Sequence, residues 1–319
     1  MQVPAQVEYE RAASVEHALD LLARYGPEAR VLAGGHSLIP MMKLRLAQPE
    51  TLIDINGLSE LSYVRLAAGE LQIGALTRHA ELLACAPAGE HFAIWHDAER
   101  LIADPIVPNW GTIASSLCQA DPSEDLSAAF AALKATMVIR GPGGSRTIPA
   151  RDFHTGPYET VVAPGEILTE VRISLRAAGQ NPAGPKGSAN GKGSAYGKGS
   201  ANGKGSAYEK VGRRVGDWPV GAAGAALWLA GGTVAEAGIG LSAVGARNFA
   251  AAEAEEFLLG APATEESFRR AGEIAAEHCR PVADQRGPAD YKRHLACELT
   301  TRALRTAARR AAGPAREIL

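Results

Sequence analysis

The sequence predicts an α+β protein, and two observations support this fold class. Short strand-like runs come in pairs around glycine-rich turns, as in residues 64–74 and 136–149. Helical segments separate these pairs instead of alternating with single strands, which argues against a regular doubly wound sheet. A 319-residue chain with 46% hydrophobic and 21% charged residues is long and apolar enough to form two domains, or three.

Composition and charge exclude several classes of protein. The net charge of −2 gives no global reason to expect a nucleic-acid partner. No signal-peptide pattern and no run of about 18 apolar residues is seen, so we expect a cytoplasmic location. The cysteines at positions 85, 118, 279 and 297 form no CxxC pair. We therefore expect reduced thiols, and neither zinc nor an iron–sulfur cluster within this chain.

The elements of the N-terminal part follow from caps, turns and periodicity. Ser14 can cap a helix whose apolar residues recur at helical spacing until Gly26. We then expect strands at 29–33 and 51–55 with a helix at 40–48 between them, a hairpin at 63–76 and helices at 77–85 and 89–103. A helix capped by Ser123, a hairpin at 136–150 and a strand at 166–175 complete this part.

Residues 177–207 differ from the rest in composition. A Lys-Gly-Ser-Ala-Asn/Tyr-Gly unit recurs from Lys186, Lys192, Lys198 and Lys204. We expect a flexible loop that grew by tandem expansion, and keep as an alternative a basic tether for RNA or a protein partner.

The C-terminal part predicts two strands around a Gly231-Gly232 turn and then helices near 248–259, 264–279 and 288–312. The expected organisation is a domain over 1–176, subdivided near residue 57, the repeat loop over 177–207, and a domain over 208–319.

Two loops of small residues are candidates for binding a phosphate. The first, VLAGGHSLIP (31–40), ends a strand with Gly34 and Gly35, which tolerate positive φ, and with the Ser37 hydroxyl. Successive N–H groups in such a turn can form an anion site, although a plain turn is the better explanation of this loop taken alone. The second, GTIASSL (111–117), also offers spare donors, and the P-loop and GxGxxG motifs are both absent. Together the loops could hold one diphosphate from two sides.

Carboxylates follow the second loop in ADPSEDL (120–126). Asp121 and Asp125 could accept hydrogen bonds from ribose hydroxyls, as acidic residues do in dinucleotide sites. The alternative is structural, because Asp121 precedes Pro122 in a turn and Asp125 favours the start of the next helix.

Two other chemistries fit the residue spacing poorly. A triad of His36, Ser37 and Asp54 lacks a GxSxG elbow, and adjacent His and Ser side chains in one turn point apart. A metal site built from His79, His91, His96 and Asp97 matches no known ligand spacing. We therefore expect neither a catalytic residue nor a metal ligand in this chain.

The two loops and their surroundings resemble a known family. AGGHSLIPMMKLRLAQPETLIDI and GTIASSLCQADPSEDL, with GPYETVVAPGEILTEVRI, SAYEKVGRR and DQRGPADYKRHLACELTTRAL, resemble the FAD-binding medium subunits of molybdenum hydroxylases of the carbon monoxide dehydrogenase type. The resemblance implies a two-part FAD-binding domain of the PCMH (vanillyl-alcohol-oxidase-like) type, followed by a small antiparallel sheet packed with helices.

The resemblance also implies which residues bind FAD. Both loops would contact the diphosphate, through Leu32, Ala33, Gly34, Gly35, His36, Ser37 and Leu38 in the first and Gly111, Thr112, Ala114, Ser115 and Ser116 in the second. Asp125 would hold the adenosine ribose, and Leu168, Tyr208 and Lys210 would lie near the flavin. One departure stands out, because the family usually has two glycines where this chain has Ala114 and Ser115. If those positions require positive φ, each substitution costs about 1–2 kcal/mol.

The implied assembly is a dimer of heterotrimers. A large subunit would carry a molybdenum–pterin cofactor and a small subunit two [2Fe–2S] clusters, while this chain passes electrons to quinone or another acceptor. The complex would be cytoplasmic or peripheral on the inner face of the membrane. A related hydroxylase of an aldehyde, N-heterocycle or aryl-CoA, and a structural subunit with weakened FAD binding, remain alternatives.

Overall fold

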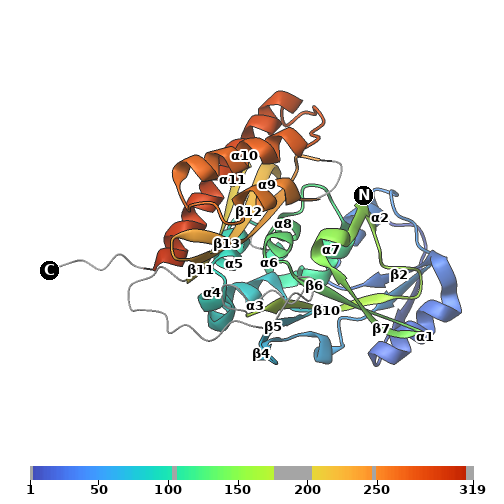
Figure 1. Cartoon of the computed structure of the whole chain (residues 1–319). Coiled ribbons are helices and arrows are strands. Elements are labelled where there is room, and N and C mark those ends of the chain that lie inside the picture. The colour runs from blue at the N-terminus through green and yellow to red at the C-terminus, as the bar shows by residue number, and fades with distance from the viewer. Residues whose placement is uncertain (1–2, 103–105, 176–202, 246–248, 314–319) are drawn as a thin grey trace.

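The computed structural model describes residues 3–102, 106–175, 203–245 and 249–313. Within these ranges the chain forms a three-stranded, a five-stranded, a four-stranded and a two-stranded sheet, with helices between and outside them (Figure 1). The predicted α+β class is confirmed. None of the described helices is long and apolar enough to span a bilayer.

The N-terminal part is a small parallel sheet in the order β1-β3-β2. Ser14 Oγ accepts a hydrogen bond from the His17 N–H and caps the first helix, as predicted. The helix expected at 40–48 is shorter, because the chain leaves helical geometry at Leu44–Arg45, where Arg45 has a φ of 61°. The elements are β1 (Glu8–Arg11), α1 (Val15–Tyr25), β2 (Ala29–Leu32), α2 (Leu38–Lys43) and β3 (Thr51–Asp54).

The second sheet is antiparallel, in the order β4-β5-β10-β6-β7. Both predicted hairpins are confirmed, and β10 inserts between them by pairing with β5 and β6. A separate two-stranded ribbon, β8 with β9, lies in the connection to β10. The elements are β4 (Val64–Ala67), β5 (Glu70–Gly74), β6 (Thr136–Gly141), β7 (Gly144–Pro149), β8 (His154–Gly156), β9 (Glu159–Thr160) and β10 (Ile167–Ser174).

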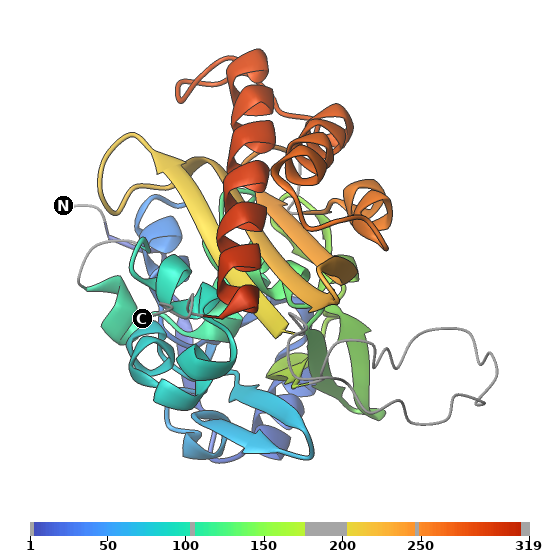
Figure 2. The same ribbon diagram turned by 60° about the vertical axis from the view of Figure 1, so that its left-hand side comes forward.

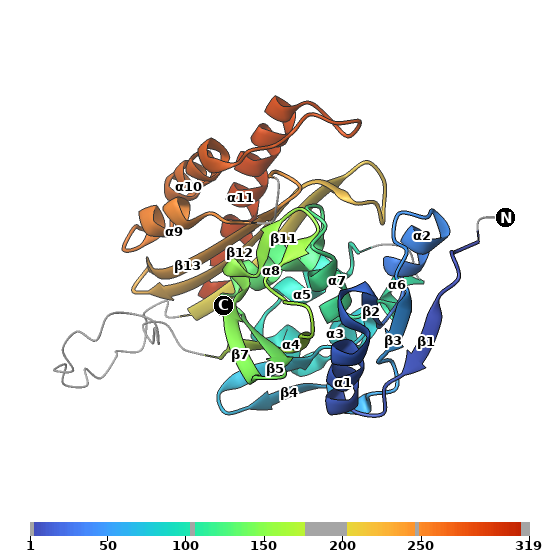
Figure 3. The same ribbon diagram turned by 90° about the vertical axis from the view of Figure 1, so that its right-hand side faces the viewer.

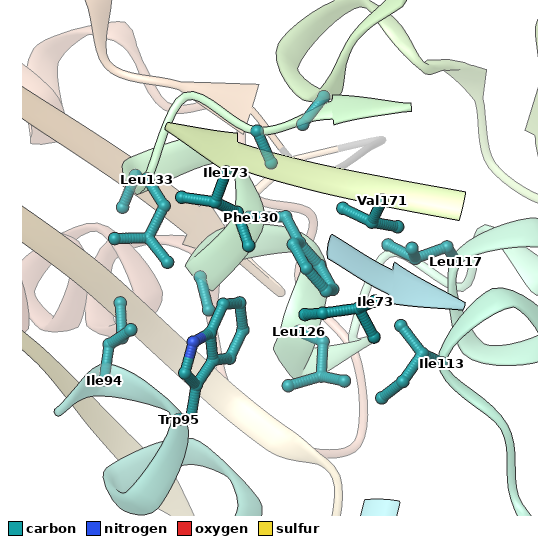
Figure 4. Close-up of a cluster of buried hydrophobic side chains, with 14 of the residues drawn as sticks. Ile73, Ile94, Trp95, Ile113, Leu117, Leu126, Phe130, Leu133, Val171 and Ile173 are labelled. Atoms are coloured by element: carbon teal, nitrogen blue, oxygen red, sulfur yellow. The ribbon is translucent and has the colours of Figure 1, made fainter. Parts of the chain in front are cut away.

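Short helices connect β5 to β6 and carry much of the core. The helix expected at 89–103 is wrong: α4 and α5 replace it, because Phe92 takes an extended backbone conformation that separates them. The side chain of Phe130 in α8 packs on Trp95 of α5, within the apolar cluster of Figure 4. The elements are α3 (His79–Ala84), α4 (Ala86–His91), α5 (Ile94–Glu99), α6 (Val107–Trp110), α7 (Ile113–Gln119) and α8 (Asp125–Ala132).

The C-terminal part is an antiparallel sheet in the order β11-β12-β13-β14, with the predicted turn at Gly231-Gly232. The long helix α11 crosses one face of this sheet (Figure 2). The strand β11 begins at Gly203, so the last five residues of the expected repeat loop belong to a strand, while 177–202 lie outside the described residues. The elements are β11 (Gly203–Gly212), β12 (Pro219–Ala230), β13 (Thr233–Ser242), β14 (Phe249–Ala250), α9 (Ala252–Leu258), α10 (Glu265–His278) and α11 (Ala289–Ala312).

The helix α8 joins the two halves of the molecule. It lies between the sheet of β12 and β13 and the sheet of β5 and β7 (Figure 3). Gly238 and Gly240 of β13 permit this packing, because a Cβ on either would collide with the carbonyl oxygen of Ala132 or Ala128. All eight residues of α8 are buried as a result, including the acidic Asp125 at its start.

Candidate functional site

The fold brings the two phosphate-loop candidates into contact. Gly34 of the first loop lies directly against the backbone of Trp110 and Gly111, which precede α7. A Cβ at Gly34 would lie 3.0 Å from the Cα of Gly111 and closer still to the carbonyl oxygen of Trp110. A glycine is therefore required here by the close approach of two chains.

Two polar side chains that sequence reasoning missed link the loops further. The Asn56 side-chain amide donates a hydrogen bond to the carbonyl oxygen of Ala33 at 2.6 Å. Arg78 donates to Asn56 Oδ1 at 3.0 Å and, through its other guanidinium nitrogen, to the carbonyl oxygen of Trp110. Arg78 thus bridges the first loop, by way of Asn56, to the chain entering the second. Asn56 and Arg78 are 22 positions apart in the chain and belong to no known sequence motif, so the sequence alone did not predict this link.

The first loop has the geometry of an anion cradle. Gly35 adopts a φ of 76°, the left-handed conformation that the glycine pair predicts. Among the described residues, the backbone N–H groups of Gly34 through Leu38 have no hydrogen-bond acceptor. The five residues are half-buried, and their successive N–H groups without an acceptor are the kind of donors that can bind a diphosphate. The residues present therefore fit the phosphate part of a dinucleotide.

The second loop is the start of α7, and its glycine replacements are not strained. Neither Ala114 nor Ser115 has a positive φ, so the strain considered from the sequence is absent. Ser115 instead completes a capping box, in which its hydroxyl accepts from the Thr112 N–H at 3.2 Å and its own N–H donates to Thr112 Oγ1 at 3.2 Å.

The first backbone N–H groups of the second loop also donate hydrogen bonds to other groups of the protein. The N–H groups of Ile113 and Ala114 donate to the carbonyl oxygens of Thr77 and Ala75. The two loops therefore differ: the first presents free N–H groups, while the second presents side-chain hydroxyls, chiefly that of Ser116.

Three further residues from the resemblance meet in a second, buried cluster. Asp125 Oδ1 accepts a hydrogen bond from the Tyr208 hydroxyl at 2.6 Å, and Oδ2 lies 2.8 Å from Lys210 Nζ. Burial raises the pKa of Asp125, against the lowering effect of Lys210, and burial together with Asp125 raises the pKa of Tyr208 well above its usual range. Both oxygens of Asp125 are thus already bound. Leu168 in β10 is 2% exposed and belongs to the apolar core.

A third set of side chains lies behind the second loop. His79 contacts Glu99 through Nδ1, at 3.0 Å, and Ser116 Oγ through Nε2, at 2.9 Å. The sequence had suggested His79 only as a weak candidate metal ligand. Because its partners lie 20 and 37 residues away, only the tertiary structure joins the three.

The alternative chemistries find no support in the described part of the chain. Asp54 accepts hydrogen bonds from Tyr9 and Asn56 and is not part of a triad with His36 and Ser37. The Asp97 carboxylate pairs with Arg310 and accepts a hydrogen bond from the Tyr208 N–H. No group of three or more His, Cys, Asp or Glu side chains that could hold a metal is found among the described residues.

Two apposed loops with a cradle of free N–H groups define a protein of the class that binds a dinucleotide diphosphate. Residues 5–175 match the family model of the FAD binding domain in molybdopterin dehydrogenase. Residues 206–307 match that of the CO dehydrogenase flavoprotein C-terminal domain.

Individual relatives cover almost the whole chain. The carbon monoxide dehydrogenase medium chain of Hydrogenophaga pseudoflava is 36% identical over 305 residues, which is 96% of this chain and 98% of that one. The glyceraldehyde dehydrogenase medium chain of Sulfolobus acidocaldarius is 31% identical over 305 residues, covering 96% of this chain and 99% of the relative.

A solved carbon monoxide dehydrogenase structure from H. pseudoflava, which lacks the Mo-pyranopterin moiety of the molybdenum cofactor, superposes with a TM-score of 0.86 at 38% identity. It covers 97% of this chain and 99% of that one. This chain belongs to the family of medium FAD subunits of carbon monoxide dehydrogenase and related molybdenum hydroxylases.

Proposed function

We propose that this chain is the FAD-carrying electron-transfer subunit of a heterotrimeric molybdenum hydroxylase that oxidises carbon monoxide. The cradle of free N–H groups at Gly34–Leu38, held against Gly111, is the observation that supports FAD binding here. The similarity to carbon monoxide dehydrogenase medium chains over nearly the whole length supports the choice of reaction.

The residues of this chain would bind and orient the cofactor. The first-loop N–H groups would hold one face of the diphosphate, and the Ser116 hydroxyl would approach it from α7. Bound FAD supplies one- and two-electron redox chemistry, so no acid or base from this chain is needed. Asp125 would reach the adenosine ribose, and Tyr208 and Lys210 would lie near the flavin, with Asp125 exchanging one of its present partners for a ribose hydroxyl.

The proposed partners are a large subunit with a molybdenum–pterin cofactor and a small subunit with two [2Fe–2S] clusters, in a dimer of heterotrimers. Electrons would pass from the small subunit through FAD to quinone or another acceptor. The complex would lie in the cytoplasm or on the inner face of the membrane.

The test is to purify the chain with its partners, record the visible spectrum and measure FAD released on denaturation. Stoichiometric FAD together with bleaching of the flavin bands by carbon monoxide supports the proposal. Absence of flavin refutes it and would favour a structural subunit. That alternative has one observation in its favour, because the Ser115 hydroxyl occupies the Thr112 N–H that a glycine would leave free.

A second candidate keeps the FAD subunit but changes the substrate, to an aldehyde, an N-heterocycle or an aryl-CoA. The similarity to a glyceraldehyde dehydrogenase medium chain favours the aldehyde. Bleaching of the flavin bands by glyceraldehyde and not by carbon monoxide would establish it.

A further inference from the structure

A buried hydrogen-bonded chain of three side chains runs behind the second loop. Glu99 ends α5, His79 begins α3 and Ser116 lies in α7, and the imidazole of His79 contacts both neighbours. The His79 and Glu99 side chains are 2% and 1% exposed, whereas Ser116 is half-buried. Of these three side chains, Ser116 is therefore the one that can reach a ligand at the loop surface.

The proton content of the His79–Glu99 pair sets the direction of the hydrogen bond to Ser116. If the pair holds two protons, one lies between Nδ1 and the carboxylate and the other on Nε2, so the ring donates to Ser116 Oγ. If the pair holds one proton, it stays on the Nδ1 side and Nε2 becomes an acceptor. The Ser116 hydroxyl then has to donate inward to the ring, whereas in the two-proton state its hydrogen is free to point outward.

The surroundings of the pair favour the two-proton state. Burial lowers the pKa of His79, but the carboxylate of Glu99, followed by those of Glu124 and Asp125, outweighs burial and leaves the pKa raised. Burial also raises the pKa of Glu99, against the lowering effect of His79. Two other helices pack on α3: α6 carries no charged residue, and α4 carries Glu90 and His91. Lys210 Nζ lies 2.8 Å from Asp125 Oδ2. Both directions favour retention of the second proton by the pair.

We propose that His79, held by Glu99, is a positioning residue that keeps the Ser116 hydroxyl turned outward as a hydrogen-bond donor to the diphosphate of FAD. This inference rests on the proposed FAD site. It explains how the second loop contributes to binding although Ser115, Thr77 and Ala75 already accept the hydrogen bonds of its first backbone N–H groups. His79 would act through Ser116 and would not itself touch the cofactor.

The test is to measure FAD affinity of the full chain between pH 5.5 and 9.5 for the wild type and designed variants. Ser116→Ala removes the outward donor, and we expect Kd to rise about 10- to 100-fold at neutral pH, the effect of losing a hydrogen bond to a charged group. Glu99→Gln favours the one-proton arrangement and is expected to raise Kd by a similar factor. Ser145→Ala, on the exposed strand β7, is the matched control and leaves Kd unchanged.

Coupling between the residues separates positioning from a merely structural role. The wild-type Kd rises as pH increases and the pair loses a proton, whereas Ser116→Ala gives a flat profile. If His79 acts only through Ser116, adding His79→Gln to Ser116→Ala causes no further rise in Kd. Circular dichroism checks that this double variant is folded. If it is not folded, the pH profiles and the Kd of Glu99→Gln test the inference instead. Equal Kd values for wild type and Ser116→Ala, or parallel pH profiles, overturn the inference while the FAD proposal stands. A wild type that binds no FAD at any pH overturns both.

Discussion

Replacing Gly34 with alanine is the sharpest test of the contact between the two loops. The added Cβ would lie 3.0 Å from the Cα of Gly111 and closer to the carbonyl oxygen of Trp110. Restoring ordinary van der Waals distance requires the two chains to separate by about 0.5–1 Å. Forcing such a separation in a packed region costs about 1–3 kcal/mol of the free energy of unfolding. The same movement displaces the N–H cradle from Ser116, so we also expect FAD affinity to fall at least about 10-fold, the loss of one charge-assisted hydrogen bond.

The assay combines thermal unfolding of the full chain with FAD titration. We expect Gly34→Ala to lower Tm by about 2–10 °C and to raise the Kd for FAD. The control is Gly89→Ala in α4, where a Cβ meets no atom within 4 Å, and we expect a gain of about 0.5–1 kcal/mol in stability with unchanged FAD affinity. If Gly34→Ala has the same Tm and the same Kd for FAD as the wild type, the loops are not closely packed and their contact has no role in the site.

Three other perturbations have defined outcomes. Arg78→Lys keeps the charge but cannot span Asn56 and Trp110, so FAD titration should show weaker binding, about 5- to 10-fold; unchanged Kd contradicts the bridge. Burial raises the pKa of Glu124 from its ordinary 4.5 to about 7, so the folded chain binds more protons over this interval and its stability falls as pH rises through it. Glu124→Gln should flatten that decline in urea unfolding measured at pH 4.5 and 7, and an unaltered slope would exclude this carboxyl as its source. Ser115→Gly should lower unfolding free energy by about 1 kcal/mol yet tighten FAD binding up to about 10-fold by freeing the Thr112 N–H; looser binding would show that this N–H does not face the diphosphate.

The unequal donor sets of the two loops have a physical consequence for cofactor binding. The first loop retains free N–H groups because α2 begins only at Leu38, after the Gly35 turn. The second loop has lost them because α7 starts at once after Thr112 and its first N–H groups meet carbonyl oxygens of the segment 75–77. FAD binding should therefore depend more on the backbone of the first loop and on side chains of the second.

Local sequence patterns predicted the elements that depend on local interactions. The Ser14 cap, the hairpins at 63–76 and 136–150, and the turn at Gly231-Gly232 were all found, because capping and turn residues act within a few positions. The cap predicted at Ser123 was wrong by one residue, because the Glu124 carboxylate accepts the N–H groups of Leu126 and Ser127 at the start of α8. The helix at 89–103 was wrong, because Phe92 takes an extended backbone conformation that the apolar periodicity of this segment did not indicate. The glycines of the first loop predicted its positive φ, but strain at Ala114 and Ser115 was an open question until the backbone of α7 answered it.

The sequence by itself determined the α+β class, the family and the two loops, since small residues at these positions carry information about local backbone freedom. Tertiary structure alone decided which donors remain free, that Asn56 and Arg78 link the loops, and that His79 lies between Glu99 and Ser116. The reason is physical: a hydrogen-bond donor is available to a ligand only after every acceptor that the fold brings near it has been counted. Those acceptors come from segments far away in the chain, and no local pattern records them.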